Sequence, residues 1–226
     1  MEDCPRTTIA RHMKISMAAF LALAGLSMSP MLAETNVRTV RFESENSSKV
    51  RIEGTTNVHD WQAQGNSIKG WLEAGRNFPF HPGQVAKPGS VEADLIATIP
   101  VESLKSIDRV GNPYNAAMDQ VLHDRLGSGD IVFRLDELAV TAGAKPNDSS
   151  YPLEGKGQLA IHGTTNTVVM PVRVRPMTGE ELEITGQTKL KMSDYAIEPW
   201  SPRYLPVVVG DEVTVRFTWI LHRKGA

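Results

Sequence analysis

The most conspicuous group of residues that could do chemistry is His59-Asp60-Trp61, at the start of a segment with strand-like alternation. In a binding site these residues would form a polar rim that meets the polar head group of a ligand, with Trp61 shielding the mouth. The alternative is structural: Trp61 points inward at a strand start, while His59 and Asp60 hydrogen-bond the amides of a turn. Adjacent strand residues point to opposite faces, so His59 and Asp60 cannot both enter one site without a bend. This geometry favours the structural interpretation.

The spacing of the other reactive residues argues against a metal site and against nucleophilic catalysis. Five histidines outside the N-terminal segment are scattered, without an H-x-x-x-H spacing: His59, His81, His123, His162 and His222. The sequence has no G-x-S-x-G elbow, and its single cysteine, Cys4, lies in a segment that we expect to be removed. A Ser-His-Asp arrangement formed only by folding would leave no such signature. We therefore predict no metal and no catalytic residue, and rank an enzyme last among the hypotheses.

The first 33 residues have the three parts of a cleavable secretory leader. A basic front precedes an uncharged apolar run over residues 15–28, which is shorter than the ~20 residues that a membrane-spanning helix needs. Ala33 then offers a small residue at the expected cut. Reading from Met13 gives a more compact leader, so we expect Met13 to be the true start. The remaining residues, 34–226, would form a single cysteine-free domain in the periplasm.

Behind the leader, apolar and polar residues alternate with a period of two. This period is typical of antiparallel sheet with one dry face and one wet face. Strands are expected at residues 37–43, 50–54, 61–72, 91–99, 131–135, 153–161, 168–174, 182–192 and 213–221. Residues 113–126 break the rhythm with apolar spacings of three and four, which predicts one short amphipathic helix. We therefore predict an all-β fold, a closed antiparallel barrel of about eight strands, with an open sandwich as the main rival.

The alternation also predicts which side chains face the interior. The inward-facing set is apolar and mixed in size: Leu95, Ala97, Ile99, Phe133, Leu159, Leu190, Phe217 and Trp219. Trp61 joins this set at its strand start, and the helix adds Met118 and Leu122 as a cap that we hypothesise to be mobile. Such a lining suits one long apolar ligand, which needs burial and few polar partners. An ordinary filled core would look identical, and alternation alone favours that simpler reading.

Four segments, in this order and spacing, resemble the YceI-like family: residues 54–61 (GTTNVHDW), the helix with Met118 and Leu122, residues 155–167, and residues 191–197 (KMSDYAI). The closing strand at 210–215 is also similar, and the resemblance spans about residues 37–223. It implies a lipocalin-like barrel whose interior tunnel holds a polyisoprenoid chain, as in a lipid or quinone carrier, and a periplasmic location. The loop at 78–90 is longer than that family suggests. The N-V-H-D-W form resembles a subgroup of the family, which leaves open a ligand other than the polyisoprenoid of its better-known members.

These observations leave two main hypotheses. The first is a periplasmic, non-catalytic carrier of a polyisoprenoid or ubiquinone-type lipid; the second is a filled barrel that acts as an interaction or stress-response module through loops such as 78–90. The formal net charge of −2 provides no basic stripe, so nucleic acid is not an expected partner. No other cofactor and no stable membrane insertion are expected. The sequence leaves a homodimer open.

Overall fold

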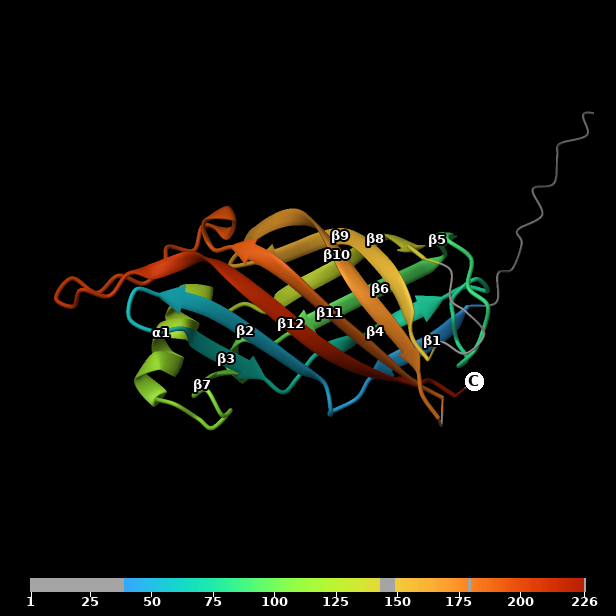
Figure 1. The fold of residues 1–226 in the computed structure, drawn as a ribbon, viewed down its shortest axis with the longest axis horizontal. Coiled ribbons are helices and arrows are strands. Elements are labelled where there is room, and N and C mark those ends of the chain that lie inside the picture. Colours follow the sequence, from blue (N-terminus) through green and yellow to red (C-terminus); the bar gives the residue numbers. More distant parts are fainter. Residues whose placement is uncertain (1–38, 143–148, 179, 226) are drawn as a thin grey trace, which may run out of the picture. The chain divides into compact units, whose positions relative to one another are not determined.

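The computed structural model describes residues 39–142, 149–178 and 180–225 (Figure 1), and the predicted leader with Met13 lies outside this part. Within the described residues the chain forms strands, one α-helix and two short 3-10 helices. In chain order these are β1 (Val40–Ser44), β2 (Lys49–Thr56), β3 (Trp61–Gly65), β4 (Lys69–Ala74), β5 (Gly89–Val91), β6 (Ala93–Ile99), η1 (Val101–Ser103), β7 (Leu104–Ile107), α1 (Ala116–Leu126), β8 (Ile131–Val140), β9 (Tyr151–Ile161), β10 (Thr164–Pro176), β11 (Glu181–Lys191), η2 (Ser193–Tyr195) and β12 (Val209–Arg223).

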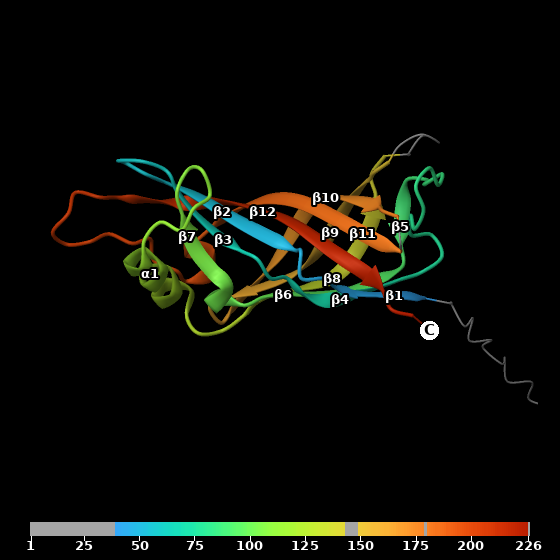
Figure 2. The same cartoon turned by 90° about the horizontal axis from the view of Figure 1, so that it is seen from below.

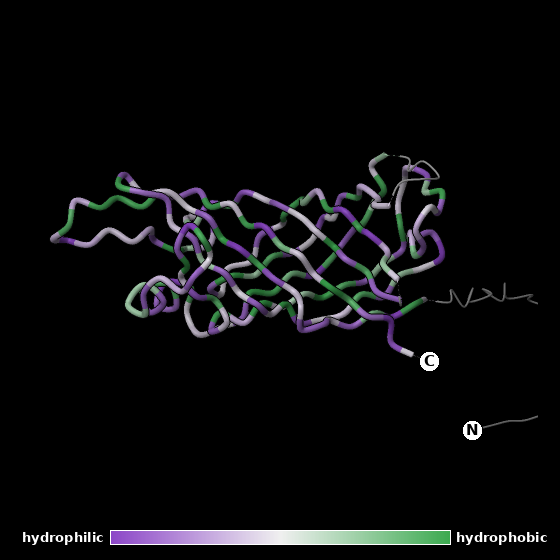
Figure 3. The backbone as a smooth tube through the Cα atoms, turned by 60° about the horizontal axis from the view of Figure 1, so that its bottom comes forward, coloured by the Kyte–Doolittle hydropathy of each residue, from purple (hydrophilic) through white to green (hydrophobic). Residues whose placement is uncertain are grey.

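Eight of these strands close into an antiparallel barrel. The ring runs β1-β4-β6-β8-β9-β10-β11-β12, and β12 returns to β1, with Phe42 opposite Arg223 and Ser44 opposite Leu221. An open sandwich would leave the first and last strands as unpaired edges. The pairing of β1 with β12 therefore confirms the predicted closed barrel. Green and purple segments alternate along the strands, as expected for one apolar and one polar face (Figure 3).

At one end of the barrel the sheet divides. The long strand β12 pairs with β1 near its C-terminus and with β2 near its start, and this branch continues through β3 to β7. The buried hydroxyl of Ser48 bridges the break between β1 and β2, accepting from the amide of Ile220 (3.1 Å) and donating to the carbonyl of Glu45 (3.0 Å). The prediction of a single strand over residues 61–72 is wrong, because the chain changes its pairing partners within this segment. Its first half, β3, pairs with β2 and β7, and its second half, β4, pairs with β1 and β6.

The helix α1 lies at the divided end (Figures 1 and 2). It begins later than the predicted residue 113, because the side chain of Asn115 caps it by accepting a hydrogen bond from the amide of Ala117 (2.8 Å). Gly127 ends it with a φ of 77°, a conformation that favours glycine. No residue of α1 is buried. Among the described residues, no helix has the length and hydropathy needed to cross a bilayer.

Polar contacts attach α1 to β7. The carboxylate of Asp119 accepts hydrogen bonds from the amide (2.6 Å) and the hydroxyl (2.7 Å) of Ser106. A ring nitrogen of His123 lies 2.8 Å from the carbonyl oxygen of Leu104. Polar contacts therefore hold α1 over the end of the barrel, where Leu122 and Leu126 pack against the core and remain partly exposed.

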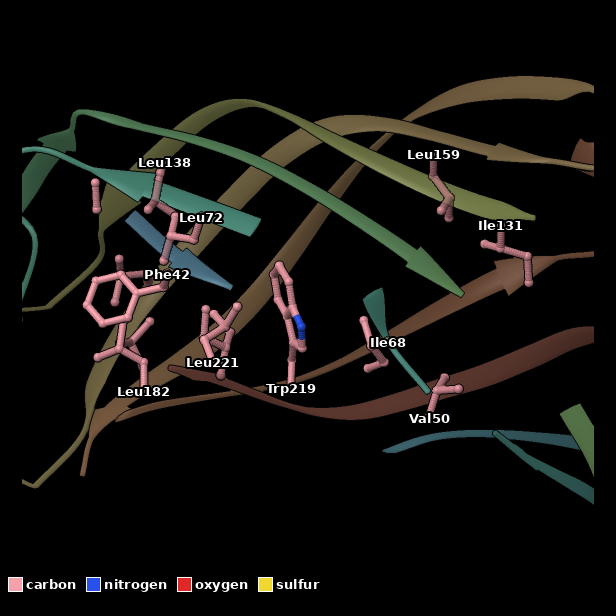
Figure 4. Packing of buried hydrophobic residues seen from close by; sticks show 14 of the residues in the cluster. Phe42, Val50, Ile68, Leu72, Ile131, Leu138, Leu159, Leu182, Trp219 and Leu221 are labelled. Atoms are coloured by element: carbon pink, nitrogen blue, oxygen red, sulfur yellow. The ribbon is translucent and has the colours of Figure 1, made fainter. Parts of the chain in front are cut away.

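The opposite end is filled by side chains. The loop between β4 and β5 turns its aromatic residues inward: Phe78 has no exposed surface, and Phe80 stacks on Phe42 with ring centroids 6.0 Å apart. The hydroxyl of Tyr151 donates to the carbonyl of His81 (2.7 Å) and fastens the loop to β9. Figure 4 shows Phe42, Leu72, Leu182 and Leu221 gathered in one group, with Ile131 and Leu159 farther along the interior. The sequence suggested this loop as an interaction surface. Its aromatic residues instead close this end of the barrel.

Candidate ligand-binding site

The barrel encloses an inner cavity of about 200 Å³. Its wall is almost wholly apolar, and it extends from Phe78 at the sealed end to Leu122 of α1 at the divided end. The structure places the following predicted residues on this wall: Leu95, Ala97, Ile99, Phe133, Leu159, Leu190, Phe217, Trp219, Trp61 and Leu122. Met118 instead lines a second cavity under the helix. The interior is thus hollow along part of its length, in contrast to the filled core that alternation alone favoured.

Three aromatic rings of the wall lie over glycines of neighbouring strands. A Cβ on Gly186 would come within 2.5 Å of the ring of its cross-strand partner Phe217, and one on Gly157 within 2.7 Å of the ring of Phe133. Trp61 covers Gly54, its partner on β2, in the same way. Because these glycines lack a side chain, the rings fold back against the wall. This packing accounts for an interior that is lined with large residues and still has space in it.

The second, outer cavity measures about 470 Å³. It is bounded by α1, by the turn between β2 and β3, and by the segment between η2 and β12. Its lining mixes apolar residues such as Val121 and Trp200 with charged residues such as Asp60 and Arg109. The site therefore has a hydrocarbon-like inner part and an outer part in which charged side chains join a mainly apolar lining, a combination that suits an amphiphile with a single long chain.

The two cavities meet at a neck. Trp61, Leu122, Arg125 and Met192 line both of them. The indole Nε1 of Trp61 is buried and has no hydrogen-bond partner among the described residues. Arg125 lies 3.9 Å from the carboxylate of Glu198. A buried donor without a partner costs about 1–3 kcal/mol, so an acceptor oxygen brought to this point would be stabilised there.

A family model for the YceI-like domain matches residues 34–220. The chain belongs to the YceI-like family. Among solved structures, BcnA of Burkholderia cenocepacia is similar at 18% identity, covering 78% of this chain and 98% of that one, with a TM-score of 0.53. A polyisoprenoid binding domain from Saccharophagus degradans, implicated in plant cell wall breakdown, is similar at 11% identity, covering 83% and 100%, with a TM-score of 0.52. At these identities the likeness shows the fold. No curated protein matches the chain.

The His59-Asp60-Trp61 motif of this YceI-like chain forms a turn and one side of the neck. Trp61 points inward, as the structural interpretation predicted. The turn amides, however, are bonded by Thr56 and not by His59 and Asp60. Its hydroxyl oxygen accepts from the amides of Val58 and His59, both at 3.0 Å, and donates to the carbonyl of His59 (2.7 Å). A ring nitrogen of His59 lies 3.0 Å from the carbonyl oxygen of Asp60. Both residues line the outer cavity, because they precede β3 and escape its alternation.

The carboxylate of Asp119, which attaches α1 to β7, has a shifted pKa. Burial raises the pKa of Asp119, but the hydrogen bonds from Ser106 and the positive charge of Lys105, 3.9 Å away, together hold that pKa below its ordinary value. Asp119 is therefore a charged anchor for α1 at neutral pH. Among the described residues, no group of three or more His, Cys, Asp or Glu side chains is placed to hold a metal ion.

Sequence reasoning missed several residues of the site. Phe78 lies in an irregular loop and had no periodic signal. Ile68 falls in the break between β3 and β4, yet it is buried and lines the inner cavity. Arg125 carries no apolar signal, yet it follows Leu122 by three residues and Val121 by four, a spacing that places it beside them. Trp200 and Val207 of the outer cavity come from a segment whose position only the folded chain reveals.

Proposed function

We propose that this protein is a periplasmic carrier that holds one isoprenoid lipid, a polyisoprenoid or an isoprenoid quinone, and performs no catalysis. The observation that supports this most directly is the apolar inner cavity, kept open by aromatic rings that lie over glycines. Burial of a methylene group contributes about 0.8 kcal/mol, so one five-carbon isoprene unit contributes roughly 4 kcal/mol. An apolar wall with few polar groups is sufficient for such a ligand.

The geometry also supports one orientation of the ligand. The inner cavity ends at Phe78, whereas the other end leads through the neck to polar residues of the outer cavity. Pockets that bury small ligands usually measure about 300–1,000 Å³, a range that the inner cavity reaches only together with the outer one. The ligand would therefore enter tail first, span the neck, and leave its polar end near Trp61 and Arg125.

The periplasmic location is supported by the N-terminal sequence, residues 1–33, which has the pattern of a secretory leader. Expression of the full chain in a bacterium should yield a mature protein that begins near Glu34 and that osmotic shock releases. N-terminal sequencing of the released protein tests this. Recovery of the unprocessed chain from the cytoplasm would contradict the proposed location.

Mass spectrometry of a solvent extract from natively purified protein tests the carrier proposal. We expect a stoichiometric isoprenoid lipid in the wild type and its loss in Phe217→Glu, which places a charge on the cavity wall. Thr218→Glu is the matched control, because Thr218 does not line the cavity and should leave the ligand in place. A wild-type protein that neither contains an apolar molecule nor takes up polyprenol or ubiquinone would overturn the proposal.

A further inference from the structure

The segment between η2 and β12 forms an arm that extends past the divided end of the barrel (Figures 1 and 2). Pro199, Pro202 and Pro206 stiffen it, because each fixes its own backbone φ. Its far end exposes two large apolar side chains: Tyr204 is 91% exposed and Leu205 is 56% exposed. Single exposed apolar residues are common on soluble proteins, but two of them at the end of a stiff projection indicate a surface that contacts a partner.

A second turn is fastened to this arm. The backbone amide of Asn57 donates to the carbonyl of Val208 (3.1 Å), its side-chain amide donates to the carbonyl of Pro206 (2.8 Å), and its side-chain oxygen accepts from the amide of Val208 (2.8 Å). Val58, next to it, is 64% exposed, and Val208 is 60% exposed. Val58 and Val208 are therefore held near each other at the base of the arm, and Tyr204 and Leu205 lie toward its far end. We call these four exposed apolar residues the docking tip.

The docking tip is continuous with the mouth of the outer cavity. Val58 belongs to both, and Trp200 and Val207 of the same arm line the cavity. An apolar path thus leads from the barrel interior through the neck to the exposed tip. A ligand that leaves the cavity along this path would meet whatever the tip is docked on.

The chemistry of the tip favours a lipid surface over a protein. Four side chains on two narrow turns present much less than the roughly 800 Å² that each partner buries in a stable protein interface. A bilayer sets no such minimum, and Tyr and Arg are the residue types that suit its boundary with water. Arg203, beside Tyr204, is exposed and pairs with no acidic group of the described residues. The acidic residue of the arm, Glu198, is instead 3.9 Å from Arg125.

We propose that the docking tip inserts into the surface of a lipid bilayer and holds the outer cavity against the membrane, so that an apolar ligand passes between them without crossing water. The passage of ligand rests on the carrier function proposed above. The docking itself does not, because vesicle binding can be measured with ligand-free protein.

Flotation with vesicles tests the docking tip. Delipidated protein should float with vesicles of phosphatidylglycerol and phosphatidylethanolamine, and the double variant Y204S/L205S should reduce the bound fraction at least tenfold. V85S/V169S is the matched control, because it removes two exposed valines (64% and 51% exposed) outside the tip and should change nothing. Arg203→Gln should weaken binding about fivefold to the anionic vesicles and leave binding to phosphatidylcholine vesicles unchanged.

Three outcomes would overturn the proposal. The first is a wild-type protein that floats with neither vesicle type. The second is a Y204S/L205S variant that has an unchanged circular dichroism spectrum and floats as well as the wild type. The third is a docking tip that mediates a dimer in sedimentation while the protein does not bind vesicles. Failure of the carrier function is distinguishable. A protein that floats but yields no lipid on extraction retracts the carrier and keeps the docking, whereas a lipid-loaded protein that does not float retracts the docking alone.

Discussion

The two ends of this barrel differ in how completely side chains fill them. At the sealed end, Phe78 and Phe80 leave a loop and enter the interior, where Phe78 is fully buried. At the divided end, Tyr204 projects outward on the arm, and the apolar residues of α1 face cavities. One sheet can therefore combine a stable closed base with a covered opening. Stability and access are assigned to different ends, so that changes at one should not disturb the other.

The largest expected effect is on the sealed end. Phe78→Ala should lower the free energy of unfolding by about 3–5 kcal/mol, because it removes a fully buried ring. Leu122→Ala at the divided end should lower it by less than about 2 kcal/mol, since this side chain faces cavities. Urea unfolding measures both values. Equal losses of unfolding free energy in the two variants would show that the two ends contribute alike to stability, contrary to the difference described above.

A smaller effect is expected in the wall between the ends. Gly186→Ala should press the ring of Phe217 into the inner cavity, lower the free energy of unfolding by about 1–3 kcal/mol, and abolish uptake of ubiquinone. The double variant G186A/F217L should regain both, because the smaller side chain leaves room for the new methyl group. Fluorescence titration and urea unfolding test this. Full uptake by the single variant would show that the glycine does not keep the cavity open.

At the neck, Trp61→Phe should affect one class of ligand only. It preserves an apolar ring over Gly54 and removes the buried N–H, so binding of a polyprenol or a quinone should weaken about fivefold to tenfold. Binding of a hydrocarbon of equal length should not change. Parallel titrations with the two ligands check this, and an equal loss for both would assign Trp61 a packing role instead.

The smallest effect concerns the attachment of α1. The pKa of Asp119 is below its unfolded value, so its contribution to stability is full above the unfolded pKa and is lost as the pH falls through the folded pKa. The helix should therefore loosen from β7 under acid conditions, below about pH 4. Hydrogen exchange at the Ser106 amide reports this. In Asp119→Asn the same amide should exchange faster at neutral pH, and its protection should no longer depend on acid; an unchanged acid profile would contradict the assignment.

The barrel and much of its wall could be predicted from the sequence, because both depend on local alternation. Leu95, Phe133 and Phe217 face the interior for the same reason that their polar neighbours face water. The YceI-like resemblance was also confirmed. That these residues contact a ligand stays a prediction, as do the leader and its start at Met13.

The rest depends on contacts between distant parts of the chain. Phe78 closes the barrel from a loop without periodicity, and the break before β4 follows from a change of pairing partner. The outer cavity requires α1, the turn near His59 and the arm near Trp200 to meet. A two-residue period carries no information on contacts between distant segments, and it could not distinguish a hollow barrel from a filled one.

The pairs formed by an aromatic ring and a glycine also determine the inner width of the barrel. The clearance beside Phe217 is determined by the single hydrogen atom that Gly186 carries in place of a side chain. One methyl group on Gly186 would meet only side chains and would narrow the interior, whereas one on Gly157 would also meet the backbone carbonyl oxygen of Arg134. For the isoprenoid ligand proposed above, the width of the chain that fits would therefore change with a single methyl group on Gly186. A comparison of relatives should therefore begin with the residues that they carry at the positions of these glycines and with the width of the ligands that they bind.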